Sequence, residues 1–296
     1  MEQYIVRGRI VISWSKAGGI LSPLLFSSYV DVVLSSLENT KSGCFINGLC
    51  LNSFLYADDL LLLSISVSDL QLLINTCNDT LDTLDLQVNS SKSYCLRLGP
   101  RFRNTCNPIM SKGFNLAWVS EAKYLGVTFK AGSKFSCSWH PARRKFFCAL
   151  NTILGTLGTN PPVDVILSLF QSFCVPVLSY GLAAIPLSTS DLSTLSFAYN
   201  SVFHKIFKTS NTTIIEQCQY YCHIWPFQAL YDYIRFSFLS NFHCNNPFNV
   251  YKFFYRTDII EFNNLAMKYK FDPCDSVGIR KSKVWKFIES SLNMSS

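Results

Sequence analysis

Residues 53–63 read SFLYADDLLLL, so that two adjacent carboxylates, Asp58 and Asp59, stand between two apolar runs. Each run has the length and composition of a buried strand, and the acidic pair falls where the chain would turn back. Like charges repel, and near a dry core their cost rises unless a cation compensates them. Magnesium would do so, because this hard cation prefers carboxylate oxygens. The stretch predicts a hairpin, either metal-binding or with a turn in which Asp forms local hydrogen bonds.

The composition points to an apolar, basic chain. Of 296 residues, 49% are hydrophobic, and 26 Lys and Arg against 19 Asp and Glu give a net charge of +7. This charge suits a polyanionic partner such as nucleic acid. Arg7, Arg9 and Lys16 interrupt the opening segment, which therefore does not read as a secretory signal. The 12 cysteines are expected to be reduced intracellular thiols, in the cytoplasm or the nucleus.

The segment Val165–Ser190 contains no charged residue and is long enough to span a bilayer. Pro176 and Pro186 lie inside it, and proline interrupts a helix. We therefore expect two helices of a soluble core here, with a membrane span as the alternative.

Upstream of the acidic pair, Tyr4–Val6 and Ile10–Trp14 predict a hairpin with Gly8 at its turn. Further hairpin strands are expected at Cys44–Ile46 and Leu49–Asn52, around an Asn-Gly turn. Between these hairpins, a loop with close backbone approach at Gly18 and Gly19 precedes a buried helix, which accepts Pro23 in its first turn and continues to about Leu37.

Downstream, a helix is expected over Ser68–Leu86 with Ser68 as its N-cap, followed by strands at Tyr94–Leu98 and Ala122–Phe129 and a loop to about Lys112 between them. Residues 131–138 gather Gly, Ser and Lys and mark a boundary. Helices are then expected over Pro141–Leu157, Pro162–Phe173, Val177–Ala184 and Ser190–Phe207. The prediction is an α+β fold with domains at 1–130, 131–210 and 211–296.

Taken in order, five segments resemble the reverse transcriptase domain of non-LTR (LINE-type) retrotransposons. Gly18–Phe26 resembles the motif that supports template and incoming nucleotide, and Phe54–Asp59 resembles the catalytic hairpin. The other segments resemble, in turn, a motif whose lysine lies near the leaving pyrophosphate, the primer-gripping hairpin and a segment after the palm: Val88–Ser93, Lys123–Val127 and Val175–Gly181.

The resemblance implies a right-hand polymerase fold, in which an antiparallel palm sheet with packed helices precedes a helical thumb-like bundle. It implies an RNA template and a DNA primer as partners, and no membrane. It also implies Mg²⁺ or Mn²⁺, which aligns the primer hydroxyl and stabilises developing charge. The roles carried over are metal binding and catalysis for Asp58 and Asp59, catalysis for Lys92, template or nucleotide contact for Gly18, Gly19, Ser22, Pro23 and Tyr56, and primer contact for Lys123, Tyr124, Leu125 and Gly126.

Two departures from the family pattern bear on activity. The family holds its ions with three aspartates, and the third should lie well upstream of Gly18, where the only acid in this sequence is Glu2. Asp31 falls on the expected helix after Pro23 and does not substitute for it. Ala17 stands where the family usually has glutamine. We therefore expect a truncated enzyme that is inactive alone and binds metal weakly; a non-catalytic nucleic-acid-binding protein and a decayed copy are the alternatives.

Two further clusters, one of basic residues and one of Cys and His, contain potential ligand-binding side chains. Arg143, Arg144 and Lys145 lie on an expected helix and could follow a nucleic-acid backbone, although a solvated helix face explains them as well. The four residues Cys218, Cys222, His223 and His243, with Cys244 beside them, match no standard zinc-finger spacing, so zinc is not expected.

Overall fold

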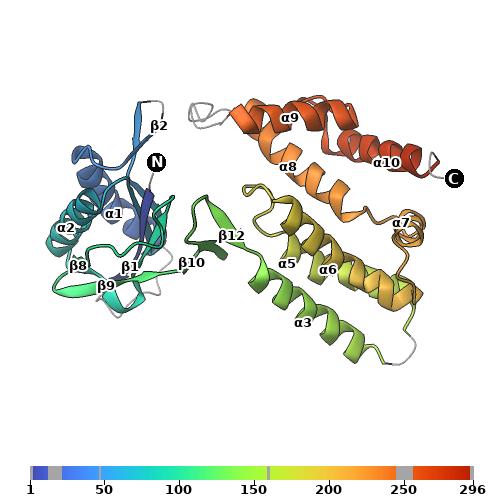
Figure 1. Ribbon diagram of the computed structural model, residues 1–296, viewed down its shortest axis with the longest axis horizontal. Helices are drawn as coiled ribbons and strands as arrows, with labels where there is room; N and C mark the ends of the chain where they lie inside the picture. Colours follow the sequence, from blue (N-terminus) through green and yellow to red (C-terminus); the bar gives the residue numbers. More distant parts are fainter. Residues whose placement is uncertain (1–2, 13–21, 47, 159–160, 245–255, 294–296) are drawn as a thin grey trace. The chain divides into compact units, whose positions relative to one another are not determined.

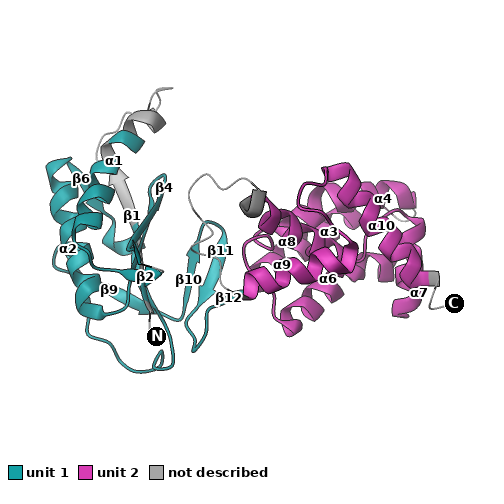
Figure 2. Cartoon of the chain, turned by 90° about the horizontal axis from the view of Figure 1, so that it is seen from above, with its two compact units in different colours: residues 1–138 teal, residues 139–296 magenta. Residues whose placement is uncertain are grey.

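The computed structural model describes residues 3–12, 22–46, 48–158, 161–244 and 256–293. The chain divides into two compact units, Met1–Ser138 and Trp139–Ser296, which Figure 2 colours separately. The described part of unit 1 combines strands with helices, and that of unit 2 is helical. The fold is therefore mixed, with an antiparallel-rich sheet in the first unit.

The elements of unit 1 follow one another in the order drawn in Figure 1. They are β1 (Gln3–Ile12), α1 (Ser22–Asn39), β2 (Cys44–Ile46), β3 (Leu49–Leu51), β4 (Ser53–Tyr56), β5 (Asp59–Ser64), α2 (Val67–Thr83), β6 (Leu86–Val88), the 3-10 turn η1 (Ser90–Lys92), β7 (Tyr94–Leu98), β8 (Ile109–Ser111), β9 (Phe114–Val119), β10 (Glu121–Tyr124), β11 (Val127–Lys130) and β12 (Ser136–Ser138).

Strand β1 is the centre of the main sheet, whose order is β4-β5-β1-β7-β9-β8, with β6 also paired to β1. The hairpin predicted at Gly8 is therefore wrong. Gly8 pairs with Leu60 inside a continuous antiparallel ladder, and Arg7 pairs with both Leu61 and Tyr94. Hydrogen bonds to neighbours on both sides hold the segment extended, which outweighs the local turn tendency of Arg-Gly-Arg.

One face of this sheet packs against the two helices α1 and α2 (Figure 1). Strand β5 alternates between buried and half-buried residues, so that Leu60 and Leu62 point into this core. Ser66 is the N-cap of helix α2, and its side chain accepts a hydrogen bond from the Asp69 amide at 3.0 Å. The predicted cap, Ser68, is thus wrong by two residues.

The opposite face carries a smaller cluster built on Leu96, Leu98 and Ala122. Ala122 belongs to β10, which pairs with β11 and then β12 in a separate three-stranded sheet. The single strand predicted over Ala122–Phe129 is therefore a hairpin, because Leu125 and Gly126 both have positive φ, at 45° and 84°, and reverse the chain.

Unit 2 consists, among the described residues, of consecutive helices (Figure 1). They are α3 (His140–Thr156), α4 (Val163–Leu169), a π-helical turn η2 (Phe170–Cys174), α5 (Val175–Ser179), α6 (Thr189–Phe207), α7 (Thr212–Tyr221), α8 (Phe227–Cys244), α9 (Arg256–Tyr269) and α10 (Val277–Asn293).

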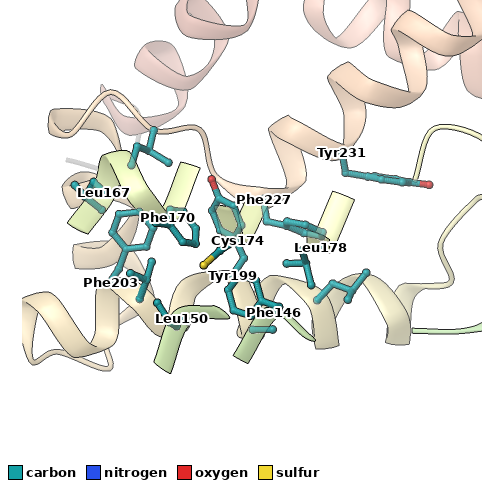
Figure 3. Packing of buried hydrophobic residues seen from close by; sticks show 14 of the residues in the cluster. Phe146, Leu150, Leu167, Phe170, Cys174, Leu178, Tyr199, Phe203, Phe227 and Tyr231 are labelled. Carbon is teal, nitrogen blue, oxygen red and sulfur yellow. The ribbon is translucent and has the colours of Figure 1, made fainter. Parts of the chain in front are cut away.

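Aromatic rings from several of these helices fill the main core of unit 2 (Figure 3). Phe170 is fully buried, and its ring lies edge-on to Tyr199, Phe146 and Phe203 at centroid distances of 5.1, 6.2 and 6.0 Å. Phe170 also opens the π-helical turn, which precedes Pro176 in one continuous helical stretch. A wider turn here relieves the clash that proline makes with the preceding turn.

The apolar segment Val165–Ser190 folds as α4, η2 and α5 and then leaves the helix after Ser179, so the helix predicted over Val177–Ala184 is wrong in its extent. Among the residues that the structure describes, no helix has the length and apolar character needed to cross a bilayer.

Candidate active site

The acidic pair lies at the turn of the β4–β5 hairpin. Tyr56 pairs with Asp59, which leaves Ala57 and Asp58 as a two-residue turn. Ala57 has a φ of +50°, a left-handed conformation that costs a non-glycine residue about 1 kcal/mol. Asp58 and Asp59 are both half-buried, whereas Tyr56 is 66% exposed. The predicted hairpin is thus present, and Asp59 is already the first residue of its second strand.

The alternation of side chains along β5 determines which face of the sheet Asp59 lies on. Because Leu60 and Leu62 point into the helix-covered core, Asp59 lies on the opposite face of the sheet. That is also the face on which Leu96 and Ala122 bring the β10–β11 hairpin against the sheet. One face of unit 1 therefore carries both the acidic hairpin and the hairpin expected to grip the primer.

Strand β1 lies next to the acidic hairpin and supplies no carboxylate there. In the register of β1 with β5, Arg9 stands opposite Asp59 and Gly8 opposite Leu60. The sequence of β1 is QYIVRGRIVI, which contains no acidic residue. Asp31 is exposed on α1. The position opposite Asp59 in the register of β1 is therefore occupied by an arginine and not by an acid.

Lys92 is exposed at the end of η1, between β6 and β7. Asn89 shapes this turn, because its side-chain oxygen accepts hydrogen bonds from the Lys92 amide at 3.2 Å and from the Ser91 hydroxyl at 2.7 Å. On β1, Ile10 pairs with Val88 and Arg7 with Tyr94, so the η1 turn lies beside the portion of β1 that faces Asp59. Two strand spacings, about 10 Å, separate their backbones.

Tyr94 was not among the residues singled out from the sequence, yet it ties the β10–β11 hairpin to the main sheet. Its hydroxyl donates a hydrogen bond to the Lys123 carbonyl at 2.7 Å and accepts one from the Lys123 amide at 3.0 Å. The contact spans 29 residues, so no local signal could have revealed it. It fixes the start of the 123–126 turn region relative to β7.

The remaining predicted residues divide into three groups. Gly18 and Gly19 lie outside the described residues. Ser22 and Pro23 form the first turn of α1, as expected for proline at a helix start. Arg143, Arg144 and Lys145 lie near the start of α3 in unit 2, where Arg143 is half-buried and the other two are exposed.

The donor chemistry at the hairpin suits a hard divalent cation only in part. Two adjacent carboxylates are the ligands that Mg²⁺ prefers, but a site of this kind needs more oxygen donors. Among the described residues, no group of three or more His, Cys, Asp and Glu side chains comes close enough to hold a metal. The residues of this chain that the structure describes therefore supply an incomplete ligand set.

The described cysteines are all free thiols. Burial raises the pKa of the Cys77 thiol and of the Cys95 thiol to about 12, so both stay protonated and unreactive at neutral pH. Cys218 and Cys222 lie on and just after α7, and burial also raises the pKa of Cys222. The side chains of His243 and Cys244 are outside the described residues.

The segment that contains the acidic hairpin is similar to known proteins. Residues 7–129 match the family described as "Reverse transcriptase (RNA-dependent DNA polymerase)". The chain is also 28% identical over 131 residues to the retrovirus-related Pol polyprotein from type-2 retrotransposable element R2DM of Drosophila melanogaster. This alignment covers 42% of the chain and 12% of that polyprotein. The chain thus spans a small part of the relative that it matches.

Proposed function

Because residues 7–129 are reverse transcriptase sequence of the non-LTR type, we propose that unit 1 is the palm of an RNA-directed DNA polymerase and unit 2 a thumb-like helical region. The observation that carries this proposal is the placement of Asp58 and Asp59 at a hairpin turn, on the same sheet face as the β10–β11 hairpin. A palm needs both features on one face, since the primer end must meet the metal ligands.

In this proposal Asp58 and Asp59 hold the divalent ion, Mg²⁺ or Mn²⁺, with Asp58 as the principal ligand. A bound divalent ion would help to activate the primer hydroxyl and would stabilise charge on the reacting phosphate. The chain by itself binds the ion weakly, because Arg9 rather than an acid stands opposite Asp59. Loss of one electrostatic group from such a site costs about 3 kcal/mol of transition-state stabilisation. The chain alone is therefore not expected to polymerise DNA.

Lys92 is proposed to neutralise or protonate the leaving pyrophosphate. It is exposed, and its turn lies about 10 Å across the sheet from Asp59, within the reach of a bound triphosphate between them. The 123–126 turn, with Lys123, Tyr124, Leu125 and Gly126, is proposed to contact the primer, and the hydrogen bonds of Tyr94 hold it in place. Tyr56, 66% exposed beside the acidic turn, is proposed to contact template or nucleotide together with Gly18, Gly19, Ser22 and Pro23.

Arg143, Arg144 and Lys145 are proposed to contact the nucleic-acid backbone. They lie near the start of α3, and the positive end of a helix dipole disfavours cations there. A bound phosphate would remove this cost, which favours an anionic partner over a purely solvated face. The RNA template and DNA primer are the partners that the family implies.

A second candidate function is binding of nucleic acid without nucleotide incorporation. The net charge of +7 favours it, because a basic chain suits a polyanionic partner whether or not a metal ion is bound. Salt-dependent binding of RNA with no primer extension would identify this function.

The test combines metal binding with primer extension on the full chain. Mn²⁺ should broaden the NMR signals of residues around Asp58 at millimolar concentration, and Asp58→Asn should abolish that broadening. Asp79→Asn, which changes an exposed acid on α2, is the matched control and should behave like the wild type. No extension of a DNA primer on an RNA template is expected with Mg²⁺ or Mn²⁺.

Two results would contradict the proposal. Broadening that survives in Asp58→Asn would remove the metal role of the hairpin. Template-dependent extension by the wild type that disappears in Asp58→Asn would instead show that the chain completes its own catalytic site.

A further inference from the structure

A pocket of about 580 Å³ opens beside the η1 turn and does not include Asp58 or Asp59 in its lining. Its walls come from β6 and the turn after it, through Gln87, Val88, Asn89, Ser90 and Ser91, and from the β8–β9 turn, through Lys112, Phe114 and Asn115. The volume lies within the range that small ligands occupy. None of the roles assigned above uses this pocket.

The β8–β9 turn explains why an apolar ring is displayed there. Ser111 pairs with Phe114, and Lys112 and Gly113 form the turn with φ values of 47° and 80°. Leu116, two residues further along β9, is buried in the core beneath α2, whereas Phe114 is 65% exposed. A large aromatic ring that remains exposed at the rim of a pocket is costly in water and suits a flat ligand that stacks on it.

The rest of the lining provides polar groups around that ring. The amides of Gln87, Asn89 and Asn115 and the hydroxyls of Ser90 and Ser91 can donate or accept hydrogen bonds. Lys112 brings a positive charge, which now pairs with Asp82 in the last turn of α2. An exposed ring, amide groups and one lysine together fit a nucleotide, with the base stacked and the phosphate near the ammonium group.

The pocket lies toward the helix-covered face of the sheet, because Phe114 is on the same side of β9 as the buried Leu116 and Lys112 pairs with Asp82 of α2. Strand β9 runs parallel to β7, with Ala117 beside Tyr94, so Phe114 and Asn115 lie next to the η1 turn that carries Lys92. From Asp59 the order across the sheet is β5, β1, β7 and β9. Three strand spacings correspond to about 14 Å along the sheet, and Asp59 points to the opposite face, so the pocket is separate from the proposed palm site.

We propose that this pocket is a binding site for one nucleotide of a single-stranded nucleic acid, with the base stacked on Phe114 and the adjacent phosphate paired with Lys112. The inference rests on the nucleic-acid function proposed above, but it needs no metal ion. Asp82 weakens phosphate binding only modestly, because the phosphate must compete with its carboxylate for Lys112 in an ion pair that is exposed to solvent.

The experiment uses the full chain, EDTA and low salt, with a fluorescent single-stranded decamer that contains one 5-iodouridine. Photocrosslinking followed by mass spectrometry should place a crosslink on Phe114, and anisotropy measures the affinity. Phe114→Ser should weaken binding about five-fold or more, which is the lower end of what stacking of one base contributes. Phe114→Tyr should retain both affinity and crosslink. RNA and DNA decamers, run side by side, show which strand is preferred.

Charge variants test the phosphate contact. Lys112→Ala should weaken binding and reduce the slope of log affinity against log salt by about 0.7, the value for one phosphate of a single strand. Asp82→Asn should strengthen binding several-fold, because it frees Lys112. Matched controls elsewhere on unit 1 are Phe45→Ser, whose ring is 54% exposed, and Lys134→Ala, which is also exposed.

The inference is overturned if Phe114→Ser binds like Phe45→Ser or if no crosslink reaches Phe114. A wild-type chain that shows no Mn²⁺ broadening but an intact Phe114 crosslink would count against the palm assignment alone, whereas broadening without the crosslink would count against the pocket alone.

Discussion

Arg235 of unit 2 and the acidic pair of unit 1 lie in contrasting environments. In unit 2, Arg235 is only 1% exposed, and its guanidinium donates hydrogen bonds to both carboxylate oxygens of Glu261 and to the Ala183 carbonyl. In unit 1, Asp58 and Asp59 are half-buried at a hairpin turn, and Lys92 is exposed. Buried, saturated charges fix helices relative to one another, whereas charges at turns can meet a ligand. We therefore expect the Arg235–Glu261 pair to contribute to stability, and Asp58, Asp59 and Lys92 to contribute to binding.

The largest expected effect tests whether the two cores act separately. Phe170→Ala removes a fully buried ring from the aromatic core of unit 2 and should lower the free energy of unfolding of that unit by about 3–5 kcal/mol. Leu73→Ala, in the fully buried core beneath the sheet of unit 1, should lower the stability of unit 1 by about 2–5 kcal/mol. Calorimetry should show that each variant lowers the melting temperature of a different unfolding transition. A single shared transition would show that the two cores unfold together.

The buried ion pair gives the next largest effect. Arg235→Leu leaves Glu261 without its guanidinium partner, and since that carboxylate is 28% exposed, we expect a loss of about 2 kcal/mol rather than the full cost for a buried pair. The double variant Arg235→Leu/Glu261→Leu should recover part of this loss. Chemical denaturation of the single and double variants measures the coupling, and purely additive losses would show that the pair does not hold α8 to α9.

The difference between local signals and contacts distant in the chain explains which features the sequence could predict. The acidic hairpin is visible because Leu60, Leu62 and the neighbouring apolar residues alternate over a short local stretch. Helix α6 agrees within one residue with the range predicted for it, because Ser188 and the apolar spacing after it are local signals. Local signals of this kind act within a few residues, so one sequence suffices to find them.

Other features depend on partners distant in the chain. Arg7-Gly8-Arg9 looks like a turn until β5 and β7 are placed on either side of it. Strand β8, only three residues long, lies in what was predicted as a loop, because its pairing with β9 and its packing beneath α2 create it. The Tyr94 contact and the pocket beside Phe114 have the same origin. For the site, the sequence could therefore name Asp58, Asp59 and Lys92 as candidates but not the residues that hold their surroundings.

A smaller effect tests how firmly the β10–β11 hairpin is held to the main sheet through Tyr94. Tyr94→Phe keeps the ring and removes the hydroxyl that donates to the Lys123 carbonyl, so the stability of unit 1 should fall by about 1 kcal/mol. The decisive readout is local, because the Lys123 amide also loses its acceptor and should exchange its hydrogen faster. Tyr124→Phe is the matched control on β10. Equal exchange at Lys123 in both variants would show that packing alone positions the hairpin.

The smallest effect concerns a second ion pair of unit 2, between Asp275 and Lys283. Burial by itself raises the pKa of Asp275, but hydrogen bonds from Lys283 at 2.7 Å and from the Asp272 amide outweigh it, so the pKa is lowered. A carboxyl with a lowered pKa stabilises the folded state above its unfolded pKa of about 4, and this contribution disappears as the pH falls through the folded pKa. The wild type should therefore exceed Asp275→Asn by about 1 kcal/mol or less at pH 7, and the two should converge in acid. Because asparagine retains an acceptor for the Asp272 amide, a difference that persists at low pH would trace the stabilisation to the shape of the turn and not to its charge.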